Sequence, residues 1–152
     1  MNIGEKSRIH GHFYFLNQLG FDGPKYIDGD YTFYADYIKS NIEISITYQG
    51  RYRVYISKLK DRLNTSKPRN EQNEKSIKRV KESHHLSKLD KNKKVWTSVS
   101  NDNFPDKYLW YYAKLIKNNL EILDGDFKKF YFWYRLLNRL GIIKYKLQPT
   151  HG

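Results

Sequence analysis

The chain alternates between apolar and polar residues on either side of a central Gln49-Gly50 pair. Isoleucines occupy every second position before that pair, and Tyr52, Val54 and Ile56 repeat the same period after it. An apolar residue at every second position is the pattern of a strand with one buried face. We therefore predict an antiparallel hairpin over residues 41–57.

The length of the hairpin loop decides which side chains share a face, because directly opposed residues lie on the same side of a sheet. A two-residue Gln49-Gly50 turn would place isoleucines beside arginines. We therefore predict a three-residue loop, Tyr48-Gln49-Gly50, with a bulge and a left-handed Gly50. This register pairs position 46 with 52, 44 with 54 and 42 with 56. The predicted buried face consists of Ile42, Ile44, Ile46, Tyr52, Val54 and Ile56.

The opposite face of the hairpin carries three candidate partner-binding residues, Arg51, Arg53 and Tyr55. Arginine and tyrosine are enriched at binding hot spots, so this face suits contact with a protein or a polyanion. A polar sheet face also occurs simply as the solvated side of a sheet. The hairpin alone does not decide between these two interpretations.

Helical spacing and turn signals precede the hairpin. One apolar stripe predicts a helix over about residues 5–19, and Gly20 is suited to end it. The stripe consists of Ile9, Phe13, Leu16 and Leu19. Residues 22–24 and 28–29 are turn signals, and the alternation over residues 31–37 predicts a strand. With the hairpin, this strand makes a three-stranded antiparallel meander.

Two more helices are predicted after residue 104. Apolar residues repeat at helical spacing from Pro105 to Asp124 and again over residues 127–140, and Gly125-Asp126 can cap both helices. So short a linker predicts an antiparallel αα-hairpin. Tyr108–Tyr112 and Phe130–Tyr134 are runs of consecutive large residues, which surround a helix completely. These helices are therefore either buried on several sides or present an aromatic patch to a partner.

Positive charge is concentrated in the middle of the chain. The net charge is +12, and the segment Arg51–Lys94 contains 15 of the 28 basic residues against five of the 16 acidic ones, a local balance of +10. Apolar residues are sparse between residues 58 and 103, which we interpret as a basic polar insertion. Two alternatives stay open for this segment. One is a helix over about residues 70–89, with Ile77, Val80 and His84 on a thin apolar stripe, and the other is a flexible segment.

Together these elements predict one α+β domain over residues 1–152, with an N-terminal helix, a three-stranded antiparallel meander, the basic insertion 58–103 and a C-terminal αα-hairpin packed on the sheet. The absence of cysteine excludes a disulfide framework. No apolar run approaches the roughly 18 residues of a membrane span, and the N-terminus lacks a hydrophobic signal region. A cytoplasmic protein without a membrane partner is the default expectation.

The sequence contains no recognisable catalytic, cofactor or metal motif. G-x-S-x-G, P-loop and G-x-G-x-x-G patterns are absent. His10 and His12 are spaced i, i+2, which a helix does not bring to one side, and the His84-His85 pair has no partner at i+4. We therefore predict a protein that is not an enzyme and that needs no cofactor or metal.

Nucleic-acid binding through the basic segment 58–94 is the alternative function. Its lysines and arginines would release counterions from a polyanion, and tyrosines of the hairpin could stack on bases. The candidate residues in this segment are Lys75, Lys78, Arg79 and Lys81. Against this alternative, the RNP1 pattern is missing and the element order is not that of an RRM domain.

Three stretches of the chain carry a resemblance to a protein class. They are Phe13-x-Phe15-Leu16-x-x-x-Gly20-Phe21, then Tyr37-x-x-Ser40-x-x-x-Ile44-x-Ile46-x-Tyr48-x-x-Arg51, then Tyr112-Ala113…Leu120…Leu123-x-Gly125-Asp126. Over about half of its length the chain resembles small uncharacterised bacterial α+β proteins similar to polymorphic-toxin immunity proteins. The resemblance implies a non-enzymatic, cytoplasmic protein-binding module. Immunity proteins against nucleic-acid-cutting toxins are usually acidic, so this basic chain would instead bind a protein with an acidic surface.

Overall fold

The structure is a computed structural model that describes residues 3–60, 80–100, 102, 105–131, 136 and 139–141. Within them lie one long helix, five strands and a series of shorter helical segments. In chain order these are α1 (Ile3–Gln18), β1 (Asp22–Asp28), β2 (Phe33–Lys39), β3 (Ile42–Tyr48), β4 (Tyr52–Leu59), β5 (Val80–His85), the 3-10 segments η1 (Leu86–Leu89) and η2 (Lys91–Lys93), α3 (Lys94–Ser98), α4 (Lys107–Lys117), η4 (Leu120–Asp124) and η5 (Lys128–Tyr131).

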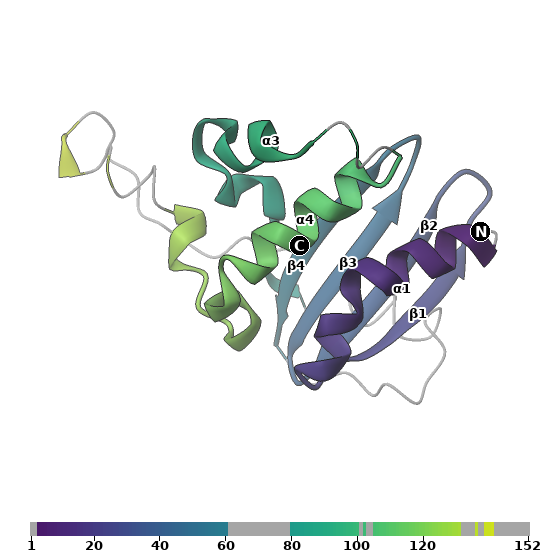
Figure 1. Cartoon of the computed structure of the whole chain (residues 1–152). Coiled ribbons are helices and arrows are strands. Elements are labelled where there is room, and N and C mark those ends of the chain that lie inside the picture. Colours follow the sequence, from purple (N-terminus) through teal and green to yellow (C-terminus); the bar gives the residue numbers. More distant parts are fainter. Residues whose placement is uncertain are drawn as a thin grey trace.

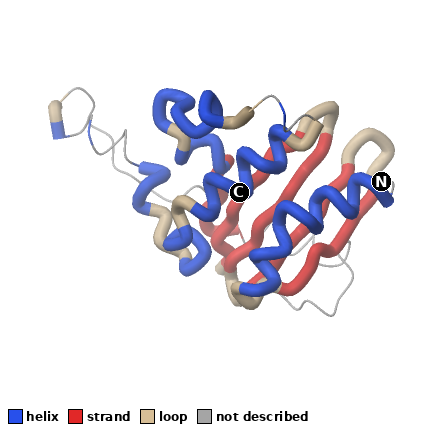
Figure 2. The backbone as a smooth tube through the Cα atoms, in the orientation of Figure 1, coloured by secondary structure: helices blue, strands red, loops and turns tan. Residues whose placement is uncertain are grey.

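The five strands form one antiparallel sheet in sequential order, β1 to β5. Helices α1 and α4 lie next to each other across one face of this sheet (Figures 1 and 2). Apolar side chains from both helices and from the central strands form a single large core, with Phe13, Ile44 and Leu115 fully buried. The predicted α+β class is therefore confirmed, but the predicted count of three strands is wrong.

The first of the two unexpected strands, β1, occupies residues that look like turns in the sequence. It pairs with β2, and the register shifts between Asp22 and Lys25. Pro24 has no amide hydrogen, which an edge strand tolerates. Gly23 has a φ of +124°, and a Cβ atom there would lie 2.5 Å from the carbonyl oxygen of Asp36. The turn-like residues thus allow the edge strand to approach β2 closely.

The β3–β4 hairpin has the predicted faces but not the predicted pairs. Tyr48 pairs with Tyr52 and Ile46 with Val54, so the three-residue loop is Gln49–Arg51, one position later than predicted. Gly50 has the expected positive φ, +73°. The pairing differs by two residues, which leaves every side chain on its predicted face. The later loop also brings the Tyr48 and Tyr52 rings to 4.9 Å from each other.

The second unexpected strand, β5, corrects the interpretation of the basic segment. Val80–His85 pairs with the end of β4, so residues 80–85 are neither helical nor part of a flexible insertion. Leu86 and Val99, which follow it, belong to the main core. The interpretation of residues 58–103 as a basic polar insertion is therefore wrong for residues 80–100. Residues 61–79 of the segment lie outside the described part of the chain.

The C-terminal part begins as predicted and then departs from a long helix. Helix α4 ends at Lys117, and residues 120–124 form a 3-10 segment that ends at Gly125, whose φ is +88°. The Asp126 carboxylate accepts a hydrogen bond from the amide of Lys128, as expected of a cap. Beyond η5, only Leu136 and residues 139–141 are described, so most of the predicted second helix lies outside the described residues.

A buried polar network anchors β5 to η5. His84 Nε2 lies 2.7 Å from Glu82 Oε2, and the Tyr131 hydroxyl donates to the same oxygen at 2.6 Å. The His84 ring also stacks on Phe130, with 4.3 Å between centroids. Burial lowers the pKa of His84, and the opposing effect of Glu82 does not compensate. Burial alone would raise the pKa of Glu82, but hydrogen bonds from Tyr131 and His84 outweigh it and lower that pKa. A neutral imidazole thus donates to a charged carboxylate.

Replacing Leu86 by alanine should lower the free energy of unfolding by about 2–5 kcal/mol, because a fully buried side chain leaves a cavity. The matched control is Leu120→Ala, since Leu120 is 47% exposed and should lose less than about 1 kcal/mol. Urea denaturation of both variants measures the difference. A loss at Leu86 as small as that at Leu120 would contradict the assignment of the segment after β5 to the core.

The lowered pKa of His84 predicts that the protein loses stability in weak acid. The unfolded chain binds a proton near pH 6.5, whereas the folded chain resists it, so the free energy of unfolding should fall as the pH drops below about 6.5. His84→Gln should reduce this dependence, whereas substitution of the exposed His10 by glutamine should not. Denaturation curves between about pH 7.5 and 5.5 measure it. An unchanged pH dependence in His84→Gln would contradict the prediction.

Candidate functional site

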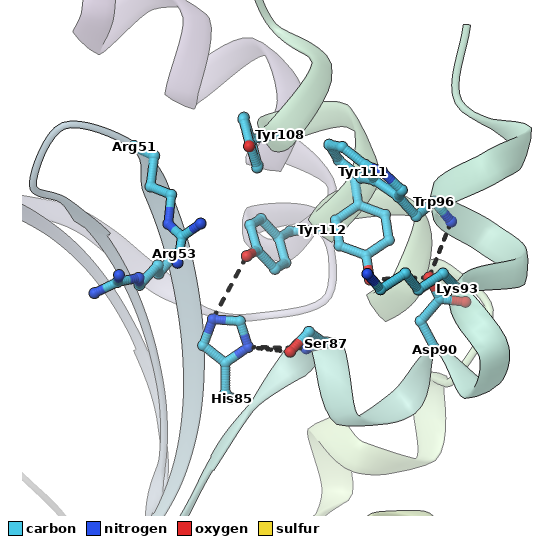
Figure 3. A pocket seen from close by; sticks show the side chains of 10 residues that line it. All are labelled: Arg51, Arg53, His85, Ser87, Asp90, Lys93, Trp96, Tyr108, Tyr111 and Tyr112. Atoms are coloured by element: carbon cyan, nitrogen blue, oxygen red, sulfur yellow. Dashed lines mark hydrogen bonds between the residues drawn. The ribbon is translucent and has the colours of Figure 1, made fainter.

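A pocket lies where β5 ends beside β4. The two strands pair only along Tyr55–Leu59 of β4, and the chain leaves the sheet after His85. A cavity of about 390 Å³ opens beyond this point, between the β3–β4 hairpin, the segment from η1 to α3, and α4 (Figure 3). We call it the sheet-edge pocket. It is lined by Arg51, Arg53, His85, Ser87, Asp90, Lys93, Trp96, Tyr108, Tyr111 and Tyr112.

Three cationic side chains line the pocket from two sides. Arg51 ends the hairpin loop and Arg53 lies in β4, while Lys93 lies across the cavity at the end of η2, directly before α3 (Figure 3). Arg51 is exposed and Arg53 is partly buried. Among the residues that the structure describes, neither arginine has an acidic partner within ion-pair distance. Their charge is thus available to a ligand.

The single acidic side chain in the described lining, Asp90, is already occupied. Its carboxylate accepts hydrogen bonds from the amides of Val95 and Trp96, at 2.7 Å and 2.9 Å, and from the Tyr111 hydroxyl at 3.0 Å. The two amides belong to the first turn of α3, where an acceptor stabilises otherwise unpaired N–H groups. Asp90 therefore fixes Trp96 and Tyr111 in the wall instead of attracting a cation.

His85 contributes a hydrogen-bond donor in a fixed tautomer. The amide of Ser87 donates to His85 Nδ1 at 3.1 Å, and an amide can only donate, so the neutral ring carries its proton on Nε2. Nε2 lies 3.5 Å from the Tyr112 hydroxyl oxygen. Burial, followed by the positive charges of Arg53 and Arg51, lowers the pKa of His85. The Nε2–H of the neutral ring therefore donates to the Tyr112 hydroxyl oxygen, which leaves the Tyr112 O–H as the donor of this pair in the pocket.

Aromatic rings form the back wall. Tyr108, Tyr111 and Tyr112 come from one side of α4, at the i, i+3 and i+4 spacing that helical neighbours require. Trp96 lies 5.1 Å from Tyr108 and 5.0 Å from Tyr111 between ring centroids. Burial raises the pKa of Tyr112 to about 12, so its hydroxyl stays protonated at neutral pH. The aromatic run in α4 thus faces both the core and the pocket.

The structure brings together only part of the predicted site. Arg51 and Arg53 line the pocket. Tyr55 is not among the lining residues, but its ring centroid lies 5.0 Å from that of the lining residue His85. Lys81 is exposed on β5 and is not among the lining residues. The other predicted candidates, Lys75, Lys78 and Arg79, lie outside the described residues.

Sequence analysis missed several residues of the pocket. His85, Ser87, Asp90, Lys93 and Trp96 were not candidates. The spacing of Tyr108, Tyr111 and Tyr112 was a usable signal, because it places three rings on one helix face. No comparable signal marks His85 or Asp90, since their roles depend on hydrogen bonds to backbone amides nearby in the fold.

Comparison with known protein families, with curated proteins and with solved structures found no match to this chain. Within the described residues, no cluster of three or more histidine or acidic side chains could hold a metal ion. No helix among them is both long enough and apolar enough to cross a membrane. The chemistry of the sheet-edge pocket is therefore the main guide to function.

The pocket presents hydrogen-bond donors and positive charge beside aromatic rings. Arg51, Arg53 and Lys93 supply charge, while the Tyr112 hydroxyl, which accepts a hydrogen bond from His85 Nε2–H, supplies a neutral donor. Such a set matches an anionic group attached to an apolar or planar body.

Asp90→Ala should lower the free energy of unfolding by about 2 kcal/mol or more, because it leaves three donors without their charged acceptor. Asp124→Ala is the matched control, since Asp124 is exposed and should change stability by less than about 0.5 kcal/mol. Thermal or urea unfolding monitors both variants. If the two substitutions cost the same, Asp90 does not organise the pocket wall.

Proposed function

We propose that this protein is a non-enzymatic binding module whose sheet-edge pocket receives an anionic side chain from a partner protein. The observation that carries the proposal is the pair Arg51 and Arg53, which line the same pocket as four aromatic side chains and lack acidic partners among the described residues. Guanidinium groups bind carboxylates and phosphates through paired hydrogen bonds. A partner with an acidic surface would supply the missing charge.

The residue types of the pocket favour a protein partner. Arginine, tyrosine and tryptophan are the side chains most enriched at interface hot spots, and these hot spots lie in packed, concave regions. The net charge of +12 would also speed the approach of an acidic partner. A protein partner and a cytoplasmic location agree with the resemblance to immunity-like proteins, which stays a prediction.

The hydrogen bonds within the pocket favour binding over catalysis. A general base needs a free lone pair directed at its substrate. The lone pair of His85 Nδ1 accepts the Ser87 amide, and Asp90 accepts three hydrogen bonds. Neither group is free to take a proton from a ligand, which supports the proposal of a protein without enzymatic activity.

Affinity capture followed by titration tests the proposal. The full chain is used as bait in a nuclease-treated extract of the producing cells, and each captured protein is purified and titrated against the wild type. Substitution of both Arg51 and Arg53 by glutamine should weaken the affinity at least tenfold, because both charged hydrogen bonds to the anion are lost. Lys81→Gln, on the same sheet but outside the pocket lining, should leave it unchanged.

Two outcomes would contradict the proposal. Capture that disappears after nuclease treatment, with an affinity that falls steeply with salt, would favour nucleic-acid binding instead. An affinity that stays the same after both arginine substitutions, in variants that unfold at the wild-type temperature, would place the partner on another surface.

A further inference from the structure

The formal charge of the sheet-edge pocket constrains the anion that it can take. Arg51, Arg53 and Lys93 contribute three positive charges to its described lining, and Asp90 contributes one negative charge, which leaves +2. His85 adds no charge, because the Ser87 amide donates to its Nδ1 and the ring is neutral. A single carboxylate would leave one positive charge uncompensated inside a partly enclosed cavity.

We propose, on the basis of the function inferred above, that the pocket recognises a phosphate monoester dianion carried on an aromatic ring, as in a phosphorylated tyrosine of the partner protein. A phosphate monoester carries about −1.5 to −2 charges at neutral pH, which balances the lining. It also offers three strong acceptor oxygens, whereas a carboxylate offers two.

The cationic and polar side chains that line the cavity come from different sides of it, so that several of them can contact a tetrahedral group. The two arginines lie on the strand side, Lys93 lies opposite, and His85 and Tyr112 lie between them (Figure 3). The phenol of Tyr112 stays protonated at neutral pH and can therefore donate. Asp90 is the single acidic side chain in the described lining that could repel the anion. Its oxygens already accept hydrogen bonds from Val95, Trp96 and Tyr111.

The aromatic wall favours a ring next to the phosphate. Trp96 and Tyr108 line the cavity beside the cationic groups, and their ring centroids are 5.1 Å apart. A planar ring on the ligand would contact these side chains, and aromatic contacts add about 0.5–1.5 kcal/mol beyond area burial. The cavity of about 390 Å³ falls within the usual size of ligand pockets, roughly 300–1,000 Å³.

An isosteric pair of small anions tests the charge balance. Phenyl phosphate and phenyl sulfate have nearly the same shape, but at about pH 7.5 the first is mainly a dianion and the second a monoanion. Isothermal titration calorimetry with the full chain should show that phenyl phosphate binds roughly tenfold more tightly than phenyl sulfate. The affinity for phenyl phosphate should fall as the pH drops through the second pKa of this ligand, near 6, while the affinity for phenyl sulfate should not change.

Variants identify the site and the reason for the preference. Arg53→Gln should weaken both ligands at least tenfold, because both anions use its guanidinium. Lys93→Gln lowers the lining charge to +1 and should reduce the preference for phosphate severalfold. Lys81→Gln is the control and should change neither affinity. Melting temperatures show whether each variant is folded, and Arg51→Gln replaces Arg53→Gln if the latter is not.

The source of the phosphate is distinguished with three further probes. A short phosphotyrosine peptide should bind at least as tightly as phenyl phosphate, and inorganic phosphate and adenosine monophosphate should bind more weakly. Tighter binding of adenosine monophosphate than of the peptide would overturn the assignment to a phosphorylated protein.

The remaining outcomes separate this inference from the proposed function. If phenyl sulfate or phenylacetate binds as tightly as phenyl phosphate and still depends on the arginines, the phosphate inference fails while an anion-binding pocket stands. If none of the anions and no purified partner responds to Arg51→Gln or Arg53→Gln, both proposals fail.

Discussion

The point at which the β4–β5 ladder ends determines both the core and the pocket. Because side chains alternate along a strand, Glu82 and His84 lie on the buried face of β5, and His85 lies on the opposite face. Pairing stops at His85, opposite Tyr55, and the chain turns into η1. The segments that follow, from η1 to α3, lie beyond this point, and the sheet-edge pocket lies between them, the β3–β4 hairpin and α4 (Figure 3).

Local periodicity was sufficient for the central hairpin and insufficient for the two outer strands. The faces of β3 and β4 were predicted correctly because a pairing error of two residues changes no face. Strand β5 was missed because Glu82 and His84 are buried through hydrogen bonds and ring stacking, so no apolar alternation marks it. Strand β1 was missed because Gly23-Pro24 has the composition of a turn while serving an edge strand.

The candidate site was predictable only where a side chain and its strand face were enough. Arg51 and Arg53 followed directly from the hairpin pattern, and the structure places both in the pocket lining. The role of Asp90 depends on amides five and six residues later, and that of His85 on the amide of Ser87. Contacts of this kind produce no recognisable residue pattern. The positive charge of the site could therefore be predicted from the sequence, but the residues that form its walls could not.

Two adjacent histidines are held neutral for different reasons, and the difference matters for the pocket. His84 is enclosed by aromatic rings of η5 and keeps Glu82 as its acceptor. His85 receives an amide hydrogen at Nδ1 and lies near two guanidinium groups, so a second proton would cost the Ser87 hydrogen bond and meet like charge. The ring therefore donates to the Tyr112 hydroxyl oxygen and adds no charge to the cavity. It follows that the pocket's preference among anions is governed by its arginines, Lys93 and Asp90 and not by the charge of His85.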